Sequence, residues 1–318
     1  MMDVVILGRI GYDLYSEEPN VPLPQARRFS RYLGGSSANM AVGLARLGAR
    51  VGMVSCLGND SLSDFLRAFL AEENIDTSHI QTAPGFLPSL SLTEVTPPDR
   101  FPQVFYRHDA VDTRLDATEE DLAYAASSRM LITNGTALCA SPSRESAYRA
   151  MECARAAGVQ VVLDVDFRSM SWRSAAEAGL AVRLALPFVD VLIGNQPEFR
   201  MVAGMDDLNA ATEKLLKSGV PLLVSKLGHE GTRALTADEQ VYLPPYKVEV
   251  CTTIGAGDGF ASGFLCARLE GLPLLECLHW GNAAAAIVVS RLNCSEAMPR
   301  REEVDALLRE QRKQQVSA

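Results

Sequence analysis

Thr252-Thr-Ile-Gly-Ala-Gly-Asp258 comes directly before an expected helix that runs from Gly259 to about Glu270. Its small residues let several backbone N–H groups point outward together, and the positive end of a helix dipole adds to them, so the stretch predicts an anion site. Asp258 is unusual there because a carboxylate repels bound phosphate. Its position suits a group that takes a proton from a hydroxyl attacking that phosphate. The alternative is an ordinary helix with a stabilising acid in its first turn, and the motif alone leaves both open.

The alternation of apolar patterns around this stretch predicts an α/β fold. Short runs rich in β-branched residues or Leu alternate with segments whose apolar residues recur about every 3.6 positions. The expected strands are Val4–Leu7, Val51–Cys56, Met130–Thr133, Val159–Val165, Val189–Ile193 and Leu222–Ser225. The expected helices between them are Ser37–Leu47, Ser61–Glu73, Ser143–Ala157 and Leu208–Ser218. Such alternation predicts a mostly parallel sheet with helices on both faces.

Two segments interrupt this alternation, at about residues 11–33 and 89–111. Each is too long for a simple loop and lacks the pattern of a long helix. Val21–Pro24 and Thr96–Pro102 are rich in proline, which indicates turns between short strands. We therefore expect the two segments to form a small antiparallel β lid over one edge of the main sheet.

Composition limits the class of protein. The chain has 318 residues, 47% of them apolar and 22% charged, which is enough for one large α/β domain or two smaller ones. The net charge of −9 argues against a general nucleic-acid or anionic-membrane surface. The seven cysteines form no C-x-x-C pair, and no window reaches the ~18 apolar residues of a membrane span. We expect a cytoplasmic protein with reduced thiols, no nucleic-acid partner and no membrane partner.

Further polar residues follow the expected strands, at the edge where open α/β sheets bind ligands. Asp13 lies just after the first strand, and its alternative role is that of a turn residue. Gly34 and Gly35 precede an expected helix that carries Asn39, which suits a polyol site or simply a capped helix. Within Asn195–Glu198, the glutamate suits a water-mediated Mg²⁺ contact, or it merely opens a helix.

Together these residues resemble the ribokinase-like, or pfkB, family of carbohydrate kinases, over essentially the whole chain. Gly34-Gly-Ser-Ser-Ala-Asn-Met-Ala-Val-Gly-Leu-Ala-Arg-Leu-Gly48 resembles the first signature of the family, and Thr253-Ile-Gly-Ala-Gly-Asp-Gly-Phe-Ala-Ser-Gly-Phe264 resembles the second. The resemblance implies a single ribokinase-like domain over residues 1–318, a three-layer α/β/α sandwich with a mostly parallel sheet and a small β lid. It also implies an ATP-dependent kinase that uses Mg²⁺ and forms a homodimer through the lid.

The same resemblance assigns roles to residues of this chain. Asp258 would be the catalytic base, beside an anion hole formed by the amides of Gly255, Ala256 and Gly257. The sugar would lie against Asp13, Gly34, Gly35 and Asn39. Lys226, Gly228 and Asn282 would lie on the nucleotide side, with Asn195 and Glu198 near Mg²⁺ and phosphate.

Two arginines indicate a sugar acid as the substrate. Arg107 and Arg168 stand where family members that act on sugar acids have an arginine, and a guanidinium pairs well with a carboxylate. Gly8–Tyr15, Asn134–Glu145, Asp164–Trp172 and Cys294–Pro299 resemble the branch that phosphorylates 5-dehydro-2-deoxygluconate in myo-inositol breakdown. The competing branch, the 2-keto-3-deoxygluconate kinases, typically has Asp-x-Asn-x-Arg where this chain has Asp164-Val-Asp-Phe-Arg168.

Two questions stay open at this stage. The family string usually begins with Asp where this chain has Thr252, so the need for an activating monovalent cation is uncertain. A catalytically silent sugar or nucleotide sensor on the same fold is the alternative to an enzyme.

Overall fold

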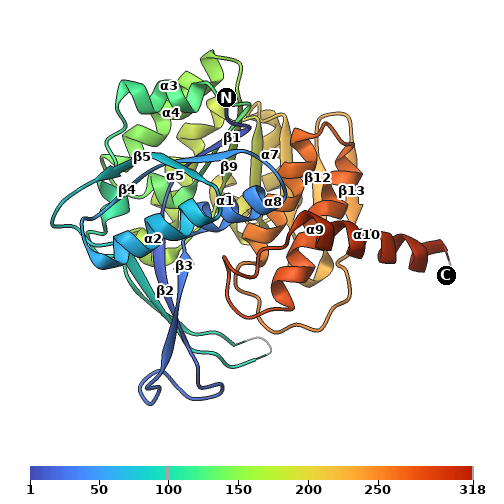
Figure 1. The fold of residues 1–318 in the computed structure, drawn as a ribbon. Helices are drawn as coiled ribbons and strands as arrows, with labels where there is room; N and C mark the ends of the chain where they lie inside the picture. Colours follow the sequence, from blue (N-terminus) through green and yellow to red (C-terminus); the bar gives the residue numbers. More distant parts are fainter. Residues whose placement is uncertain (98–99, 317–318) are drawn as a thin grey trace.

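A large, mostly parallel sheet forms the centre of the molecule. The computed structural model describes residues 1–97 and 100–316, and in that part the sheet has nine strands in the order β13-β12-β11-β10-β9-β8-β1-β4-β5 (Figure 1). The strands are β1 (Val4–Leu7), β4 (Val51–Leu57), β5 (Asp76–Thr82), β8 (Met130–Asn134), β9 (Gln160–Asp164), β10 (Val191–Asn195), β11 (Leu222–Lys226), β12 (Thr232–Leu235) and β13 (Gln240–Leu243). In the described part, β12 is antiparallel to both of its neighbours, β11 and β13, and all other neighbouring strands pair in parallel.

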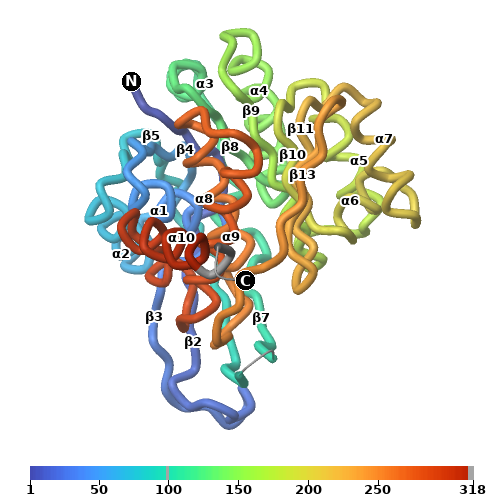
Figure 2. Tube along the Cα trace, turned by 90° about the vertical axis from the view of Figure 1, so that its right-hand side faces the viewer, coloured from blue at the N-terminus to red at the C-terminus, as the bar shows by residue number. Residues whose placement is uncertain are grey.

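Helices cover both faces of this sheet, as Figure 2 shows with the sheet between two layers. One layer holds α1, α2, α8 and α9, with α10 packed on α9, and the other holds α3 to α7. The helices are α1 (Ser36–Arg46), α2 (Ser61–Glu72), α3 (Glu119–Ala126), α4 (Ser143–Ala156), α5 (Ala175–Ala185), α6 (Gln196–Ala203), α7 (Leu208–Lys217), α8 (Ala256–Leu269), α9 (Leu274–Val289) and α10 (Arg301–Val316). Across residues 1–97 and 100–316, none of the helices has the length and apolar character needed to cross a bilayer.

The central strands form because their side chains are apolar on both faces. All four residues of β1 are fully buried, and every residue of β4 is buried. A continuous apolar run of this kind is typical of a parallel strand covered on both sides. The three-layer α/β/α sandwich expected from the sequence is confirmed.

A second sheet projects from the main body, with the strand order β3-β2-β6-β7 (Figure 1). Its strands are β2 (Gly11–Ser16), β3 (Phe29–Gly34), β6 (Ser89–Thr93) and β7 (Gln103–Tyr106). They lie in the two segments that interrupt the alternation, of which residues 98 and 99 fall outside the described part. The expectation of a purely antiparallel sheet is wrong, because β2 and β6 pair in parallel. Each leaves the main sheet at the same edge, after the parallel strands β1 and β5, so they run in the same direction.

The helix behind the opening motif begins one turn earlier than the sequence suggests. We expected it from Gly259, but α8 begins at Ala256, and Gly255 is its N-cap residue. Gly255 has a φ of 80°, a conformation that side-chain-bearing residues rarely adopt. The chain turns into the helix at this glycine, so Asp258 lies in the first turn.

Candidate active site

The amino terminus of α8 forms the anion-binding part of the site. Its first backbone N–H groups have no carbonyl partner within the helix and point out of its end. The amide of Ala256 donates a long hydrogen bond to the carbonyl of Thr253 (3.4 Å), and the amide of Gly259 donates to the carbonyl of Gly255 (2.9 Å). The amides of Gly257 and Asp258 are left to face an anion. A Cβ atom at Gly255 would meet Cys294 at 3.2 Å, a tight contact that adds to the preference for glycine that φ already sets. The amide of Ala256 is thus occupied within the chain, and the anion hole of Gly255, Ala256 and Gly257 stays a prediction.

Asp258 is the buried carboxylate at this helix end. Its residue is 9% exposed, and its Oδ2 accepts a hydrogen bond from Nδ2 of Asn39, at 2.8 Å. Burial, followed by the negative charge of Asp166, raises the pKa of Asp258 to about 7, while Asn39 and Arg168 act in the opposite direction. A carboxyl group with such a pKa is suited to accept a proton near neutral pH.

Asn39 links the two signature segments. It lies on α1, whose N-cap residue Gly35 has a φ of 93°. Its Nδ2 holds Asp258, while its Oδ1 is buried and has no hydrogen-bond partner in the described part of the chain. A buried acceptor without a donor is costly. A hydroxyl of a bound polyol would satisfy it, and that hydroxyl would lie next to the Asp258 carboxylate.

Asp13 lies on β2, at the base of the second sheet. Its Oδ1 accepts a hydrogen bond from Oγ of Ser91 (2.7 Å), and burial raises its pKa. A Cβ atom at Gly34 would fall 2.2 Å from the carboxyl carbon of Asp13, so Gly34 makes the space in which this side chain lies. A Cβ atom at Gly35 would meet the carbonyl oxygen of Arg9 at 2.6 Å. These glycines act by letting chain segments approach closely.

A second acidic group follows β9, where the sequence singled out only Arg168. Nε of Arg168 pairs with Oδ1 of Asp166 at 3.0 Å, and Oγ of Ser36 donates to Oδ2 of Asp166 at 2.5 Å. Asp166 has a φ of 34°, which directs the chain sharply after the strand. The negative charge of Asp258 helps to raise the pKa of Arg168, so the two side chains belong to the same site.

Lys226, at the end of β11, brings a positive charge to the anion hole. Its Nζ pairs with both oxygens of Asp164, at 3.1 and 2.9 Å, and a Cβ atom at Gly257 would lie 3.3 Å from it. Burial lowers the pKa of Lys226, but Asp164 and Glu198 outweigh it and raise that pKa above its ordinary value. The ammonium group therefore stays charged, directly beside the first turn of α8.

Glu198 and Asn195 form a capping box at the start of α6. Oε2 of Glu198 accepts from the amide of Asn195 (2.7 Å), Oε1 accepts from the amide of Phe167 (2.9 Å), and Oδ1 of Asn195 accepts from the amide of Glu198 (2.9 Å). Burial raises the pKa of Glu198, against the opposing effect of Lys226. Glu198 therefore opens a helix, as the alternative interpretation held. Its carboxylate also lies within the electrostatic reach of Lys226.

The donor set fits a metal ion held through water rather than in a protein cage. In residues 1–97 and 100–316 there is no group of three or more His, Cys, Asp or Glu side chains placed to hold a metal ion. Mg²⁺ commonly keeps several waters and uses one or two carboxylates together with substrate phosphates. Glu198 is suitable for such a role, since each of its oxygens accepts only one hydrogen bond from the chain and has a second lone pair.

The other residues predicted on the nucleotide side, Asn282 and Gly228, have contacts or backbone conformations that shape the fold. Asn282 is buried on α9, where its Oδ1 accepts from Oγ1 of Thr232 and its Nδ2 donates to the carbonyl of Pro244, both at 2.9 Å. Gly228 follows β11 with a φ of 64° and turns the chain. Asn282 therefore holds neighbouring segments together, and its contact with a nucleotide stays a prediction.

Arg107 is largely occupied by protein groups. Its Nη2 donates to Asp112 (2.5 Å) and to the carbonyl of Thr136 (3.0 Å), and its Nη1 donates to Ser171 (2.7 Å) and Cys139 (3.3 Å). Its role as a carboxylate ligand stays a prediction, and its present contacts bind several loops together.

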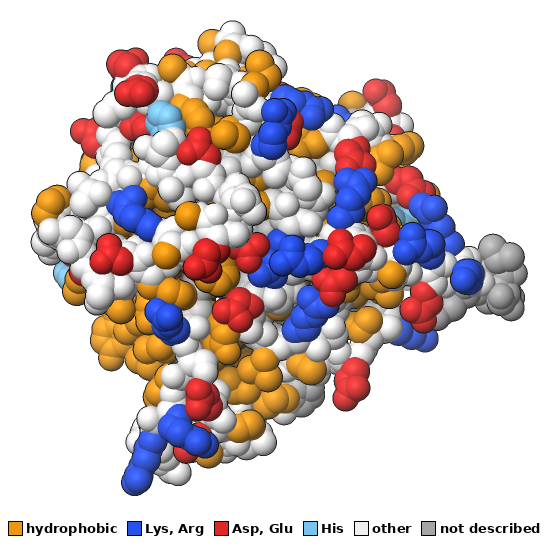
Figure 3. Space-filling model, viewed as in Figure 1, with side chains coloured by type: hydrophobic (Ala, Val, Ile, Leu, Met, Phe, Trp, Pro, Cys, Tyr) orange, Lys and Arg blue, Asp and Glu red, His pale blue; other side chains and the backbone are white. Residues whose placement is uncertain are grey.

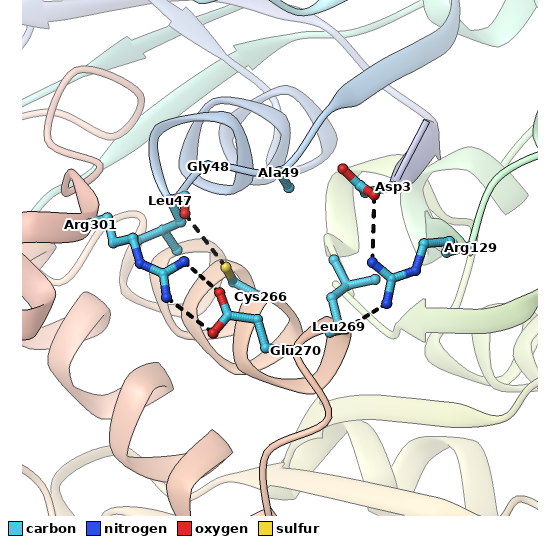
Figure 4. Close-up of a pocket in the computed structure, with 9 residues that line it drawn as sticks. All are labelled: Asp3, Leu47, Gly48, Ala49, Arg129, Cys266, Leu269, Glu270 and Arg301. Carbon is cyan, nitrogen blue, oxygen red and sulfur yellow. Dashed lines mark hydrogen bonds and ion pairs between the residues drawn. The ribbon is translucent and has the colours of Figure 1, made fainter. Parts of the chain in front are cut away.

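A separate cavity of about 120 Å³ lies at the opposite edge of the main sheet, where strands β1 and β8 begin (Figure 4). It contains two arginines, but each is paired: Arg301 with Glu270, and Arg129 with Asp3 at 3.5 Å. Because these charges are balanced, the cavity offers no comparable anion site.

At the amino terminus of α8, a buried carboxyl group of raised pKa lies beside a buried amide oxygen that has no donor among the described residues, an arrangement suited to phosphorylating a hydroxyl group. The chain belongs to the pfkB family of carbohydrate kinases, whose model matches residues 1–301.

Individual relatives agree with this assignment. The chain is 36% identical to a 5-dehydro-2-deoxygluconokinase of Lacticaseibacillus casei, over 99% of this chain and 98% of that protein. It is 38% identical to a 5-dehydro-2-deoxygluconokinase of Shouchella clausii (strain KSM-K16), over 97% and 96%. The crystal structure of a PfkB protein from Polaromonas sp. JS666 superimposes with a TM-score of 0.85 at 29% identity, over 96% of this chain and 100% of that one. A putative ribokinase II from E. coli, solved with ATP and Mg²⁺, has the same fold, with a TM-score of 0.90 at 22% identity over 98% and 100%.

Sequence reasoning missed several residues of this site. Asp164 and Asp166 stand two positions apart at the end of a buried strand, and such a pair of acids is itself a sequence signal. Ser91 and Ser36 have no sequence signal, because their partners Asp13 and Asp166 lie 78 and 130 positions away along the chain.

Proposed function

We propose that this protein is an ATP-dependent sugar-acid kinase that phosphorylates the terminal hydroxyl of 5-dehydro-2-deoxy-D-gluconate, a step of myo-inositol catabolism. The hydrogen-bonded pair of Asn39 and Asp258 at the amino terminus of α8 carries the proposal. It presents a base of raised pKa and an unsatisfied acceptor beside backbone amides suited to phosphate. The names of the Lacticaseibacillus casei and Shouchella clausii relatives support the choice of substrate.

The base would act on the attacking hydroxyl, and the anion hole would act on the phosphoryl group that is transferred. Asp258 accepts the proton of the attacking hydroxyl, and the amides that follow Gly255 stabilise charge on the transferring group. Lys226 adds a fixed positive charge at 3.3 Å from the Cβ position of Gly257. Because the transfer is driven mainly by positioning and charge, these preorganised groups supply most of the chemistry.

ATP and Mg²⁺ complete the proposed site. Bound Mg²⁺ supplies charge neutralisation between the phosphates, and Glu198, with Asn195 beside it, is the residue that would hold its water shell. Gly228 and Asn282 shape the segments on the nucleotide side.

The opposite end of the substrate is held on the sugar side. Asp13 accepts a hydrogen bond from a hydroxyl group further along the sugar chain, and Arg168 faces the negative charge of the substrate. Holding the far end aims the terminal hydroxyl at Asp258, which raises the fraction of productive encounters.

The test is ATP-dependent phosphorylation of a panel that contains 5-dehydro-2-deoxygluconate, 2-keto-3-deoxygluconate, ribose, fructose and a nucleoside. A clear preference for the first compound is expected. Preference for the second would assign the protein to the competing branch, and preference for a neutral sugar would refute a sugar-acid site. Ligand binding without turnover of any compound would indicate a sensor.

The second sheet is proposed to act as a lid and as the interface of a homodimer. Its strand β7 has one side open to solvent, with Val104 46% exposed and Tyr106 60% exposed. Figure 3 shows hydrophobic side chains gathered where this sheet leaves the main body. Light scattering after size exclusion should give twice the monomer mass, and Tyr106→Glu should shift the protein towards monomer. A wild-type monomer at micromolar concentration would contradict the interface.

A further inference from the structure

Arg9 is a buried arginine that the roles described above leave unused. It lies in the loop between β1 and β2, and its residue is 7% exposed, close to the values of Asp13 and Asp258. Its guanidinium donates one hydrogen bond, from Nη1 to Oγ of Ser89 at 3.0 Å, while Nε is buried without a partner among the described residues. An arginine has five donors and stays protonated, so this side chain is far from satisfied.

The guanidinium lies on the same face of the second sheet as Asp13. A Cβ atom at Gly11 would meet Nη1 of Arg9 at 2.8 Å, and Gly11 pairs with Ser89 across β2 and β6. Asp13 pairs with Ser91 two positions further along the same strands. Positions i and i+2 of a strand share one face, about 7 Å apart, so the guanidinium over Gly11 lies on the same face as the side chain of Asp13.

The carboxylates near Arg9 are held by other partners. The negative charges of Asp112, Asp13 and Asp166 raise the pKa of Arg9, and the positive charge of Arg107 lowers it. Asp112 pairs with Arg107, and Asp166 pairs with Arg168.

Asp13 accepts its hydrogen bond from Ser91. Among the described residues, Arg9 itself forms no ion pair, and burial together with the repulsion from Arg107 lowers its pKa. The site therefore holds a buried cation whose donors lack an anionic acceptor.

We propose that Arg9 binds the carboxylate of the sugar acid, next to the hydroxyls bound by Asp13, and so makes the site select an acid over a neutral sugar. The inference rests on the proposed function, and it names the residue that provides its specificity. Arg107 donates to Asp112 and to the carbonyl of Thr136, so it holds these segments together. A planar guanidinium with free donors is the group that best matches a carboxylate.

The test compares kcat/KM for the preferred acid with that for its carboxamide, which keeps the hydroxyl and keto groups but lacks the charge. Arg9→Gln should lower the ratio of acid to carboxamide by about 10–100-fold, as expected for lost charge-assisted hydrogen bonds. Most of the loss should appear in KM for the acid, with kcat for the carboxamide unchanged. Arg9→Lys should recover part of the ratio, because it keeps the charge without the fork. Arg309→Gln, which removes an exposed arginine of α10, should leave the ratio as in the wild type.

The outcomes separate the inference from the function on which it rests. If the wild-type protein phosphorylates no sugar acid, the proposed function fails. If it prefers the acid but Arg9→Gln affects acid and carboxamide equally, only the role of Arg9 is refuted. Thermal unfolding is measured for each variant, and if Arg9→Gln does not fold, an unchanged ratio in Arg9→Lys overturns the proposal.

Discussion

The pH dependence of turnover tests the electrostatics of Asp258 in detail. Its pKa is raised from 3.8 to about 7, with burial as the largest cause and the charge of Asp166 as the second. The base works only when deprotonated, so kcat/KM should be half its maximum near pH 7, level off about one pH unit above, and fall tenfold per pH unit at lower pH. Asp166→Asn removes the second cause and also frees the positive charge of Arg168 from its ion pair. Both changes favour the ionised form of Asp258. The fall of kcat/KM at low pH, the acid limb of the profile, should therefore move to lower pH.

The size of that movement follows from the charges. Two unit charges about 4–8 Å apart interact by roughly 2–4 kcal/mol at an effective dielectric constant near 20, and 1.36 kcal/mol corresponds to one pKa unit. Because Asp166 is already paired with Arg168 at 3.0 Å, we expect a net shift of about one unit. Asn39→Ala removes a hydrogen bond that lowers the pKa of Asp258, so its acid limb should move in the opposite direction.

The assay is kcat/KM for the sugar acid from pH 5 to 9, at saturating MgATP and constant ionic strength. Asp238→Asn, an exposed residue of the β12–β13 turn, removes one negative charge far from the site and should leave the limb unmoved. The reasoning is refuted if Asp166→Asn and Asn39→Ala move the limb in the same direction, or if neither moves it.

Three further changes follow from the site. Gly34→Ala would place a Cβ atom 2.2 Å from the carboxyl carbon of Asp13, so KM for the sugar should rise at least about tenfold in steady-state assays, and an unchanged KM would contradict the close packing. Lys226→Met leaves Asp164 buried without its partner, so the free energy of unfolding in urea should fall by about 3–5 kcal/mol and turnover should fall too. A variant as stable as the wild type would mean that the ion pair is solvated. The hydroxyl of Thr252 accepts a hydrogen bond from the amide of Ile254 at 3.1 Å, and Thr252 contributes no carboxylate to the loop. Equal turnover rates in K⁺ and in tetramethylammonium are therefore expected. Strong activation by K⁺ would refute this prediction.

The sequence predicts the centre of the fold well and its edges poorly. All six expected strands coincide with β1, β4 and β8 to β11, because a doubly covered parallel strand is a short, continuous apolar run. The outer strand β5, Asp-Thr-Ser-His-Ile-Gln-Thr, escapes such a pattern because only Ile80 of its residues is buried. Its pairing with β4 is a tertiary effect that local composition does not encode.

The site divides in the same way. A helix after the glycine-rich stretch could be predicted because such a helix start has a compact local signature, and its phosphate-binding role stays a prediction. The direction of β2 against β6 was missed, since it depends on where both strands leave the main sheet. Arg9 was also missed, because its lack of an ionic partner is a property of the folded surroundings and not of its neighbours in sequence.

The most direct test of the account is the Asp258→Asn variant, measured for turnover and for binding together. A neutral amide cannot take the hydroxyl proton but fills the same space, so turnover should disappear while the dissociation constants of sugar acid and MgATP, from calorimetry, stay within about tenfold of the wild type. Near-normal turnover in this variant would remove Asp258 from its role as the base and contradict the mechanism.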